Sequence, residues 1–344
     1  MRTSTARVAT LAATLALAGS GLVLAAPAAQ AAPVFTVSNI DSDGFAHDDS
    51  AGTCTESGQV ESGTNNDVPV IENGPAVPAS ASASVTASNG GDVMTSTAAV
   101  SSAGSISSVG TNLKSIDFTT QGSINITSTL PTSSCDLHTG ANTNLDFTFT
   151  VAQPGFLTVK IKKSGGVYAE FYLQMVTPAN SPYSSSYGDG MTVDQTTRIY
   201  LPAGSYTGSS TGSVGDTYSE AYSGTGSGSI HAAFTVAGST TAALSGKGKK
   251  YVTFPAARTC AAHLIATKIT DKKKRASDVK QVKFFVNDAL VKKVNTPDKG
   301  EAVNLSVADN VTADVTVQVK LFPARKGKPG KVYEASTSYE ACSG

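Results

Sequence analysis

The chain has 344 residues, with 26 basic and 26 acidic side chains, 32 glycines, four cysteines and no tryptophan. Before residue 245 it is poor in Leu, Glu and Lys and rich in Ser, Thr, Gly and Val, which argues against a helical protein. Short β-branched runs separated by Gly, Asn and Pro instead predict an all-β fold of sandwich type. Beyond the N-terminal stretch no segment approaches 18 apolar residues, so we expect no membrane span in the mature chain.

Residues 1–31 have the features of a secretion signal. Arg2 and Arg7 precede the apolar run VATLAATLALAGSGLVLAA, and AQA at positions 29–31 is a small-x-small cleavage sequence. The alanine-rich leader resembles those of secreted proteins from high-GC Gram-positive bacteria, and the ending YEACSG has no hydrophobic tail or sorting-type motif. We therefore expect a secreted bacterial protein, extracellular or associated with the cell wall. An uncleaved membrane anchor is the alternative.

The charge is distributed unevenly along the mature chain. Residues 246–344 carry 19 basic and 9 acidic side chains, a net charge of +10, whereas residues 32–245 carry 5 basic and 17 acidic ones, a net charge of −12. This contrast predicts an acidic, Ser/Thr/Gly-rich domain over 32–238 and a basic domain over 251–344. The segment AGSTTAALSGKGKK between them is rich in small and polar residues, and we expect a flexible linker over 239–250.

The cysteines are even in number in a chain that we expect to enter an oxidising compartment. Three pairings are possible in principle. The domain boundary favours Cys54 with Cys135 and Cys260 with Cys342. Free or metal-bound thiols are the alternative, but the chain has neither a Cys-x-x-Cys pair nor a histidine at ligand spacing.

The first domain shows the two-residue alternation of half-buried strands. In LDFTFTVAQPGFLTVKI, Leu145, Phe147, Phe149 and Val151 share one face, and the chain turns at Pro154. The more polar stretch over residues 80–130 could be partly disordered, but its apolar residues recur at sheet spacing, which favours strands.

Part of this domain resembles a known family. FTFTVAQPGFLTVKI followed by RIYLPAGSYTG is similar to the pre-peptidase C-terminal type of β-sandwich module, found after the catalytic domains of secreted bacterial peptidases. The resemblance covers roughly residues 145–238 and implies a jelly-roll-like sandwich with a non-catalytic accessory role. No peptidase domain accompanies it in this chain.

The second domain alternates more regularly. TADVTVQVKLF places Ala313, Val315, Val317 and Val319 on one face, and VKQVKFFVNDALVKKV reads as a hairpin about Asn287. About seven short strands, with a cysteine near each end, resemble a bacterial immunoglobulin-like sandwich. The absence of tryptophan argues against a true antibody-type domain.

This domain also carries clustered positive charge, in KGKK, DKKKR and ARKGKPGK. The residues are Lys272, Lys273, Lys274, Arg275, Arg325, Lys326 and Lys328. They are either solvated loops or a patch for an anionic partner. Outside the cell a wall polymer or an acidic polysaccharide is a more suitable partner than nucleic acid. Docking on the acidic first domain is a third option.

IDSDGFAHDDSAG gathers Asp41, Asp43, Asp48 and Asp49, hard oxygen ligands that could hold a structural calcium ion. The spacing differs from that of an EF-hand, because the glycine comes early and the closing glutamate is missing. A solvated acidic loop is the alternative. The four histidines are scattered without metal-ligand spacing, and we expect no other cofactor.

Tyrosines cluster in sequence near two aspartates. Aromatic faces stack on sugar rings and carboxylates accept hydrogen bonds from hydroxyls. The candidate ligand-binding residues are Tyr183, Tyr187, Asp189, Asp194 and Tyr206. We expect some of these rings to be buried instead, because alternate residues of a strand point into the core.

No assembled catalytic group is evident. GSSTG formally matches a nucleophile elbow with Ser210, but an elbow needs a following helix, and the next residues are Gly/Ser-rich. We therefore expect a non-enzymatic binding or structural protein of the cell envelope or extracellular matrix. A carbohydrate-binding module using the tyrosines is the first alternative, and a hydrolase with an unrecognised site is the second.

Overall fold

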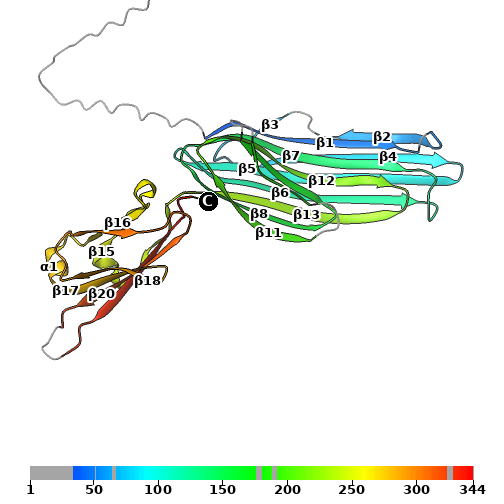
Figure 1. Ribbon diagram of the computed structural model, residues 1–344. Coiled ribbons are helices and arrows are strands. Elements are labelled where there is room, and N and C mark those ends of the chain that lie inside the picture. The colour runs from blue at the N-terminus through cyan, green and yellow to red at the C-terminus, as the bar shows by residue number, and fades with distance from the viewer. Residues whose placement is uncertain are drawn as a thin grey trace, which may run out of the picture. The chain divides into compact units, whose positions relative to one another are not determined.

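The computed structural model describes residues 34–344, except for 51, 64–66, 176–179, 188–191, 324–327 and 344. Almost all regular structure in these residues is antiparallel β-strand, which confirms the predicted all-β class (Figure 1). The strands form two sheets before residue 237 and two after residue 239, and the two pairs share no strand. The division into two domains stays a prediction. The predicted leader over 1–31 lies outside the described residues.

The first two sheets form a sandwich, because both supply residues to the same hydrophobic clusters. Sheet A has the strand order β10-β9-β12-β7-β1-β3. Its strands are β1 (Phe35–Asp48), β3 (Val68–Pro69), β7 (Leu137–Val151), β9 (Tyr168–Met175), β10 (Asn180–Tyr187) and β12 (Gly204–Tyr218). Sheet B has the order β11-β8-β13-β6-β5-β4-β2. Its strands are β2 (Thr55–Ser62), β4 (Val77–Asn89), β5 (Asp92–Val109), β6 (Asn112–Ser128), β8 (Gly155–Gly165), β11 (Val193–Leu201) and β13 (Tyr222–Val236).

The apolar residues of the predicted alternating strands form the larger part of this core. Leu145, Phe147 and Phe149 of β7 are buried, as expected, and β8 begins directly after the predicted turn at Pro154. Their neighbours from sheet B include Phe118 of β6. Burying each of these side chains contributes about 1.5–3 kcal/mol.

The polar stretch over 80–130 is confirmed as strands. It forms β4, β5 and β6. The inward positions of β4 are mostly alanines such as Ala81 and Ala83, whereas those of β6 include large side chains such as Phe118 and Ile124. The outward positions of the same strands are mostly Ser and Thr. The strands therefore bury one face in spite of their polar composition, because nearly all the polarity lies on the other face.

The remaining two sheets form around a separate core of valines and aromatic residues. A five-stranded sheet has the order β14-β21-β20-β17-β18 and a three-stranded sheet the order β15-β16-β19. The strands are β14 (Thr240–Ser245), β15 (Val252–Thr253), β16 (Leu264–Ile269), β17 (Val279–Val286), β18 (Ala289–Asn295), β19 (Ala302–Ser306), β20 (Ala313–Leu321) and β21 (Val332–Tyr339). The predicted hairpin joins β17 and β18, and Asn287 and Asp288 adopt φ values of 47° and 65° at its turn. The buried face of β20 is the predicted one.

The linker predicted over residues 239–250 is wrong. This segment contains β14, which pairs with β21, and the 3-10 helix η1 (Lys247–Lys250). The prediction failed because it was based on composition, and an edge strand of small and polar residues has the same composition as a linker. Thr337 Oγ1 donates to the carbonyl oxygen of Ala242 at 2.7 Å, which further ties the strand to its neighbour.

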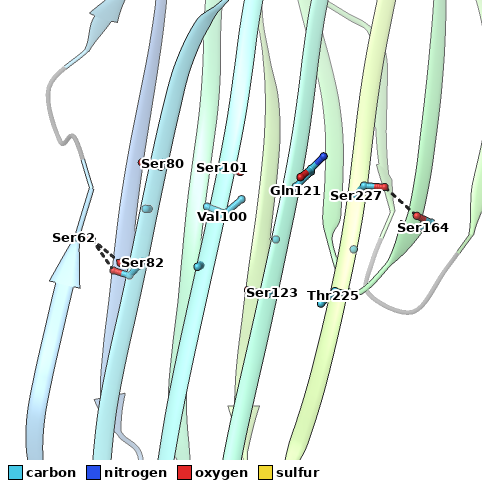
Figure 2. A pocket seen from close by; sticks show the side chains of 14 residues that line it. Ser62, Ser80, Ser82, Val100, Ser101, Gln121, Ser123, Ser164, Thr225 and Ser227 are labelled. Carbon is cyan, nitrogen blue, oxygen red and sulfur yellow. Dashed lines mark hydrogen bonds between the residues drawn. The ribbon is translucent and has the colours of Figure 1, made fainter.

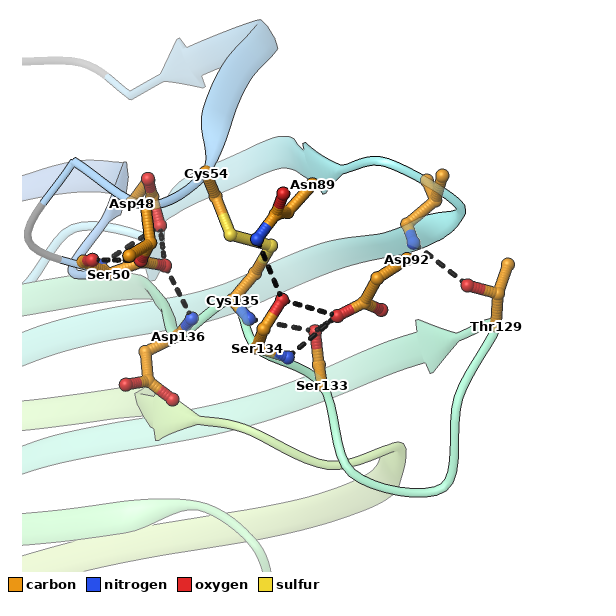
Figure 3. Close-up of a disulfide and its surroundings, with 12 residues drawn as sticks. Asp48, Ser50, Cys54, Asn89, Asp92, Thr129, Ser133, Ser134, Cys135 and Asp136 are labelled. Carbon is orange, nitrogen blue, oxygen red and sulfur yellow. Dashed lines mark hydrogen bonds between the residues drawn. A yellow bond between two sulfur atoms is a disulfide. The ribbon is translucent and has the colours of Figure 1, made fainter.

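Both predicted disulfides are confirmed. Cys54 is bonded to Cys135 and Cys260 to Cys342. The segment that carries Cys135 is held by Asp92, whose Oδ2 accepts hydrogen bonds from Ser133 Oγ at 2.9 Å and from the backbone N–H of Ser134 at 2.6 Å (Figure 3). These bonds, that of the Ser134 N–H above all, lower the pKa of Asp92. Across the described residues, no helix has the length and apolarity needed to cross a bilayer.

Candidate binding surface

The prediction that Tyr206 binds a ligand is wrong. Its side chain is fully buried, and its hydroxyl donates a hydrogen bond to the carbonyl oxygen of Pro202 at 2.8 Å. Its ring stacks on that of Phe149, with centroids 5.5 Å apart. Burial, and to a lesser degree Tyr200, raises the pKa of Tyr206 to about 12. Tyr206 is therefore a core residue that closes the turn between β11 and β12.

The other residues of the predicted tyrosine platform lie in different sheets. Tyr183 and Tyr187 belong to β10 of sheet A, where they pair in register with Leu173 and Ala169. Asp194 is exposed on β11 of sheet B, and its Oδ2 lies 3.3 Å from Lys162 Nζ. Asp189 lies outside the described residues. A sugar-binding role for these residues stays a prediction.

The predicted basic patch is only partly within the described residues. Lys272, Lys273 and Lys274 are exposed at the start of α1 (Lys273–Ser277). Arg275 is half-buried and donates to the carbonyl oxygen of Lys250 at 3.4 Å. Lys328 is exposed, whereas Arg325 and Lys326 lie outside the described residues. An anionic partner for this surface stays a prediction.

The structure does not bring the four predicted calcium-binding aspartates together as one loop. Asp41, Asp43 and Asp48 lie within strand β1, and alternation turns the first two outward beside β7. Asp48 Oδ1 accepts the backbone N–H of Ser50 at 3.1 Å. Within the described residues the four aspartates do not converge, and only Asp49 belongs to a group of side chains that could together ligate a metal ion. Burial, with repulsion from Asp146 and other carboxylates, raises the pKa of Asp41.

Ser210 lies inside β12 and is fully buried, so the chain has no nucleophile elbow at this position. The local structure agrees with the expectation that no helix follows GSSTG. The residues that follow continue the strand as far as Tyr218 rather than beginning a helix.

The outer face of sheet B contains an open trough of about 770 Å³ that crosses six of its strands (Figure 2). Its polar lining comes from β2, β4, β5, β6, β13 and β8. The residues are Ser62, Ser80, Ser82, Ser101, Gln121, Ser123, Ser164, Thr225 and Ser227. Except for Ser62 on the edge strand β2, whose residues are all exposed, they are outward positions of strands whose alternate residues fill the core, so their direction follows from the pleat.

The strand register aligns these residues in two rows across the sheet. One row runs from Ser80 through Ser101, Gln121 and Ser227 to Ser164. The second row lies two residues along each strand, about 6.7 Å away. It runs from Ser62 through Ser82, Ala99 and Ser123 to Thr225.

Hydrogen bonding differs between the margins and the centre of the trough. At the margins hydroxyls pair with one another, with Ser62 Oγ 2.7 Å from Ser82 Oγ and Ser164 Oγ 3.1 Å from Ser227 Oγ (Figure 2). At the centre the side chains of Ser101, Gln121 and Ser123 are exposed and have no hydrogen-bond partner among the described residues. These central groups are therefore available to water or to a ligand.

The sequence interpretation missed this surface. It considered the polar residues over 80–130 only as a sign of disorder, although the outward Ser, Thr and Gln of these strands were visible in the alternation. It could not align them, because the pairing of β6 with β13 joins residues about 100 positions apart.

A second polar face lies outside sheet A. Tyr168 and Tyr172 of β9 are half-buried, and their hydroxyls donate to Glu170 Oε2 and Gln174 Oε1, each at 3.0 Å. Each tyrosine hydroxyl therefore reaches a side chain two positions on along its own strand. The sequence interpretation did not select these two tyrosines.

No protein-family model and no curated protein matches the chain. Among solved structures it is similar to the adhesin domain of Epf from Streptococcus pyogenes, with 10% identity, a TM-score of 0.20, and coverage of 68% of this chain and 79% of that one. It is also similar to beta-glucuronidase from Ruminococcus gnavus, with 8% identity, a TM-score of 0.19, and coverage of 57% and 35%. Likenesses at these scores support no conclusion about this protein.

Proposed function

We propose that the protein is an extracellular, non-enzymatic binding protein, and that the trough on sheet B holds an uncharged, hydroxyl-rich polymer such as a polysaccharide of the envelope or matrix. The observation that supports this most directly is the set of unpartnered hydroxyl and amide groups at the centre of the trough. The two disulfides suit an oxidising compartment.

The chemistry of the lining favours a neutral ligand. Hydroxyl and amide groups donate and accept hydrogen bonds without carrying charge at any physiological pH. An anionic or cationic polymer would gain no ion pair from the trough residues. A polysaccharide offers hydroxyls that match both rows.

The dimensions favour an oligomer. Neighbouring strands lie about 4.8 Å apart, so six strands give the trough a span of about 24 Å. A ligand that runs across the strands can contact both rows along this length. Because each hydrogen bond contributes only about 0.5–1.5 kcal/mol, several contacts are needed for measurable affinity.

The test is binding of purified mature protein to insoluble polysaccharides, followed by calorimetry with oligosaccharides of increasing length. We expect affinity to rise with length up to several units. Ser123→Arg places a long side chain in the trough and should weaken binding at least tenfold. Thr127→Arg is the matched control, since Thr127 lies on the same strand and the same face but outside the trough. Equal binding by wild type and Ser123→Arg would refute the assignment.

Three alternatives have their own outcomes in binding experiments of this kind. Loss of binding in Tyr172→Ala, with Ser123→Arg unaffected, would move the binding site to sheet A. Release of soluble sugar products over time would show turnover and contradict a purely binding role. For the basic residues near α1, binding to an anionic wall polymer that falls steeply with salt would establish a separate electrostatic site.

A further inference from the structure

Two histidines and an aspartate that are not close in sequence meet at one end of sheet A. His47 of β1 and His138 of β7 are directly opposite each other in the register, and their rings lie 4.8 Å apart. Asp49 follows the end of β1, and its carboxylate contacts both rings. Asp49 Oδ1 is 3.1 Å from His47 Nε2, and Asp49 Oδ2 is 3.7 Å from His138 Nδ1.

We propose that His47, Asp49 and His138 form a binding site for a divalent transition-metal ion, with zinc as its best-fitting member. One ligand atom from each side chain lies within 4.8 Å of the other two. A tetrahedral zinc ion with bonds of about 2.0–2.1 Å holds neighbouring ligand atoms about 3.3–3.4 Å apart. The separations of 3.1 Å from His47 to Asp49 Oδ1 and of 3.7 Å from His138 to Asp49 Oδ2 are of this size, and a carboxylate that binds through one oxygen has to turn that oxygen towards both imidazoles.

The donor set favours zinc over calcium. Two imidazole nitrogens and one carboxylate suit borderline metal ions, whereas calcium takes six to eight oxygen ligands. Three protein ligands leave a fourth tetrahedral position. The three side chains are 36–47% exposed, so this position is open to water or to a small ligand.

The backbone holds Asp49 in place before any ion arrives. The N–H of Asp49 donates to the carbonyl oxygen of Asp136 at 2.7 Å and thus extends the β1–β7 ladder by one step. In return, the N–H of Asp136 donates to Ser50 Oγ at 2.7 Å, and the Cys54–Cys135 disulfide joins the two segments just beyond (Figure 3). Because the backbone of Asp49 is held in advance, less conformational freedom is lost when its side chain binds an ion.

Phe45 fixes the ring of His138. Phe45 lies on the same face of β1 as His47. Its ring meets that of His138 edge-on, with the ring centroids 5.0 Å apart and the ring planes at 84°. Its ring covers Gly140, where a Cβ atom would come within 2.3 Å of Phe45 Cζ. The imidazole therefore has an aromatic wall on one side and His47 on the other.

Nearby charge also favours a cation. Glu56 Oε2 accepts the backbone N–H of Asp48 at 2.9 Å, and Glu61 Oε1 accepts that of Ala46 at 2.9 Å. Both carboxylates therefore lie beside the end of β1 that carries His47. A divalent ion would reduce the repulsion between these groups and Asp49.

The test uses the mature, disulfide-bonded protein, freed of metal with a chelator and titrated with zinc chloride by calorimetry. We expect one ion per chain with micromolar or tighter affinity, and a rise in Tm. Two-dimensional NMR should show the imidazole signals of His47 and His138 shifting together. Those of His231 and His263 should not move. Calcium chloride should produce none of these changes.

His47→Ala and Asp49→Asn should each weaken zinc binding at least tenfold. His231→Ala is the matched control, because His231 also contacts a carboxylate, that of Asp117, but has no second imidazole within the group. Millimolar affinity, equal shifts of all four imidazoles, or unchanged affinity in His47→Ala would overturn the proposal. The wild-type NMR titration decides the question even if a variant fails to fold.

Discussion

Replacing Tyr206 by phenylalanine removes one hydroxyl from the core of the first sandwich and leaves the ring in place. The hydroxyl is fully buried and donates to the carbonyl oxygen of Pro202 at 2.8 Å. At pH 7 we expect Tyr206→Phe to lower the free energy of unfolding by about 0.5–1.5 kcal/mol, the usual net contribution of such a bond.

At alkaline pH the sign of this difference should reverse. The pKa of Tyr206 is raised from 10.0 to about 12, mainly by burial. Its stabilising contribution is fully present below pH 10 and is lost as the pH rises to 12, because the phenol ionises first in the unfolded chain. A shift of two units corresponds to a loss of about 3 kcal/mol. The variant lacks this loss, which equals the 0.5–1.5 kcal/mol contribution of the hydrogen bond between about pH 10 and pH 11, and the variant should be the more stable protein above that crossover.

Urea unfolding followed by far-UV circular dichroism at pH 7, 9 and 11 measures both effects. Alkaline disulfide exchange is limited because the described residues include no free cysteine. Tyr222→Phe is the control, since Tyr222 is 40% exposed and should change stability little at any of these pH values. A variant that stays less stable than wild type by the same margin at pH 11 would refute the argument.

Two further predictions concern cross-links and packing. Replacing both cysteines of either disulfide by serine, Cys54 with Cys135 or Cys260 with Cys342, should lower the free energy of unfolding by about 4.5 kcal/mol, because the bonded residues are 81 and 82 positions apart. Urea unfolding of the two double variants measures this loss. A loss under 1 kcal/mol would contradict the prediction. Gly122→Ala should cost about 1–3 kcal/mol through overpacking, since its Cβ would lie 2.4 Å from Val214 Cγ1. Val214→Ala should relieve much of that cost in the same chain, and strictly additive losses would show that the two residues do not compete for space.

Alternation allowed much of the fold to be predicted. Where large apolar residues recur at every second position, as at Leu145–Val151 and Ala313–Val319, the buried face was identified correctly. The cysteine pairing was also accessible, because the charge contrast along the chain suggested which cysteines belong together. Both predictions depend on features that a single sequence shows directly: the spacing of neighbouring residues and the charge composition of each half of the chain.

The wrong predictions arose where the sequence lacks such a local signal. Residues 239–250 and 41–49 are small or polar, and composition alone cannot distinguish an edge strand from a loop. Tyr206 was misplaced because an alternating strand has two faces, and the sequence does not say which face carries the ligand. The pairing of His47 with His138 depends on the β1–β7 register, which joins residues 91 positions apart.

The trough and the core of sheet B depend on the same register. A slip of one residue between β5 and β6 would turn Gln121 and Ser123 into the core and bring Ile124 to the surface. The burial of Ile116, Phe118 and Ile124 therefore fixes where the hydroxyl rows lie. The register shifts that do occur, between Ser57 and Val60 and between Ser107 and Ser108, fall outside the trough. A regular polar surface can thus be maintained by apolar residues that never touch its ligand.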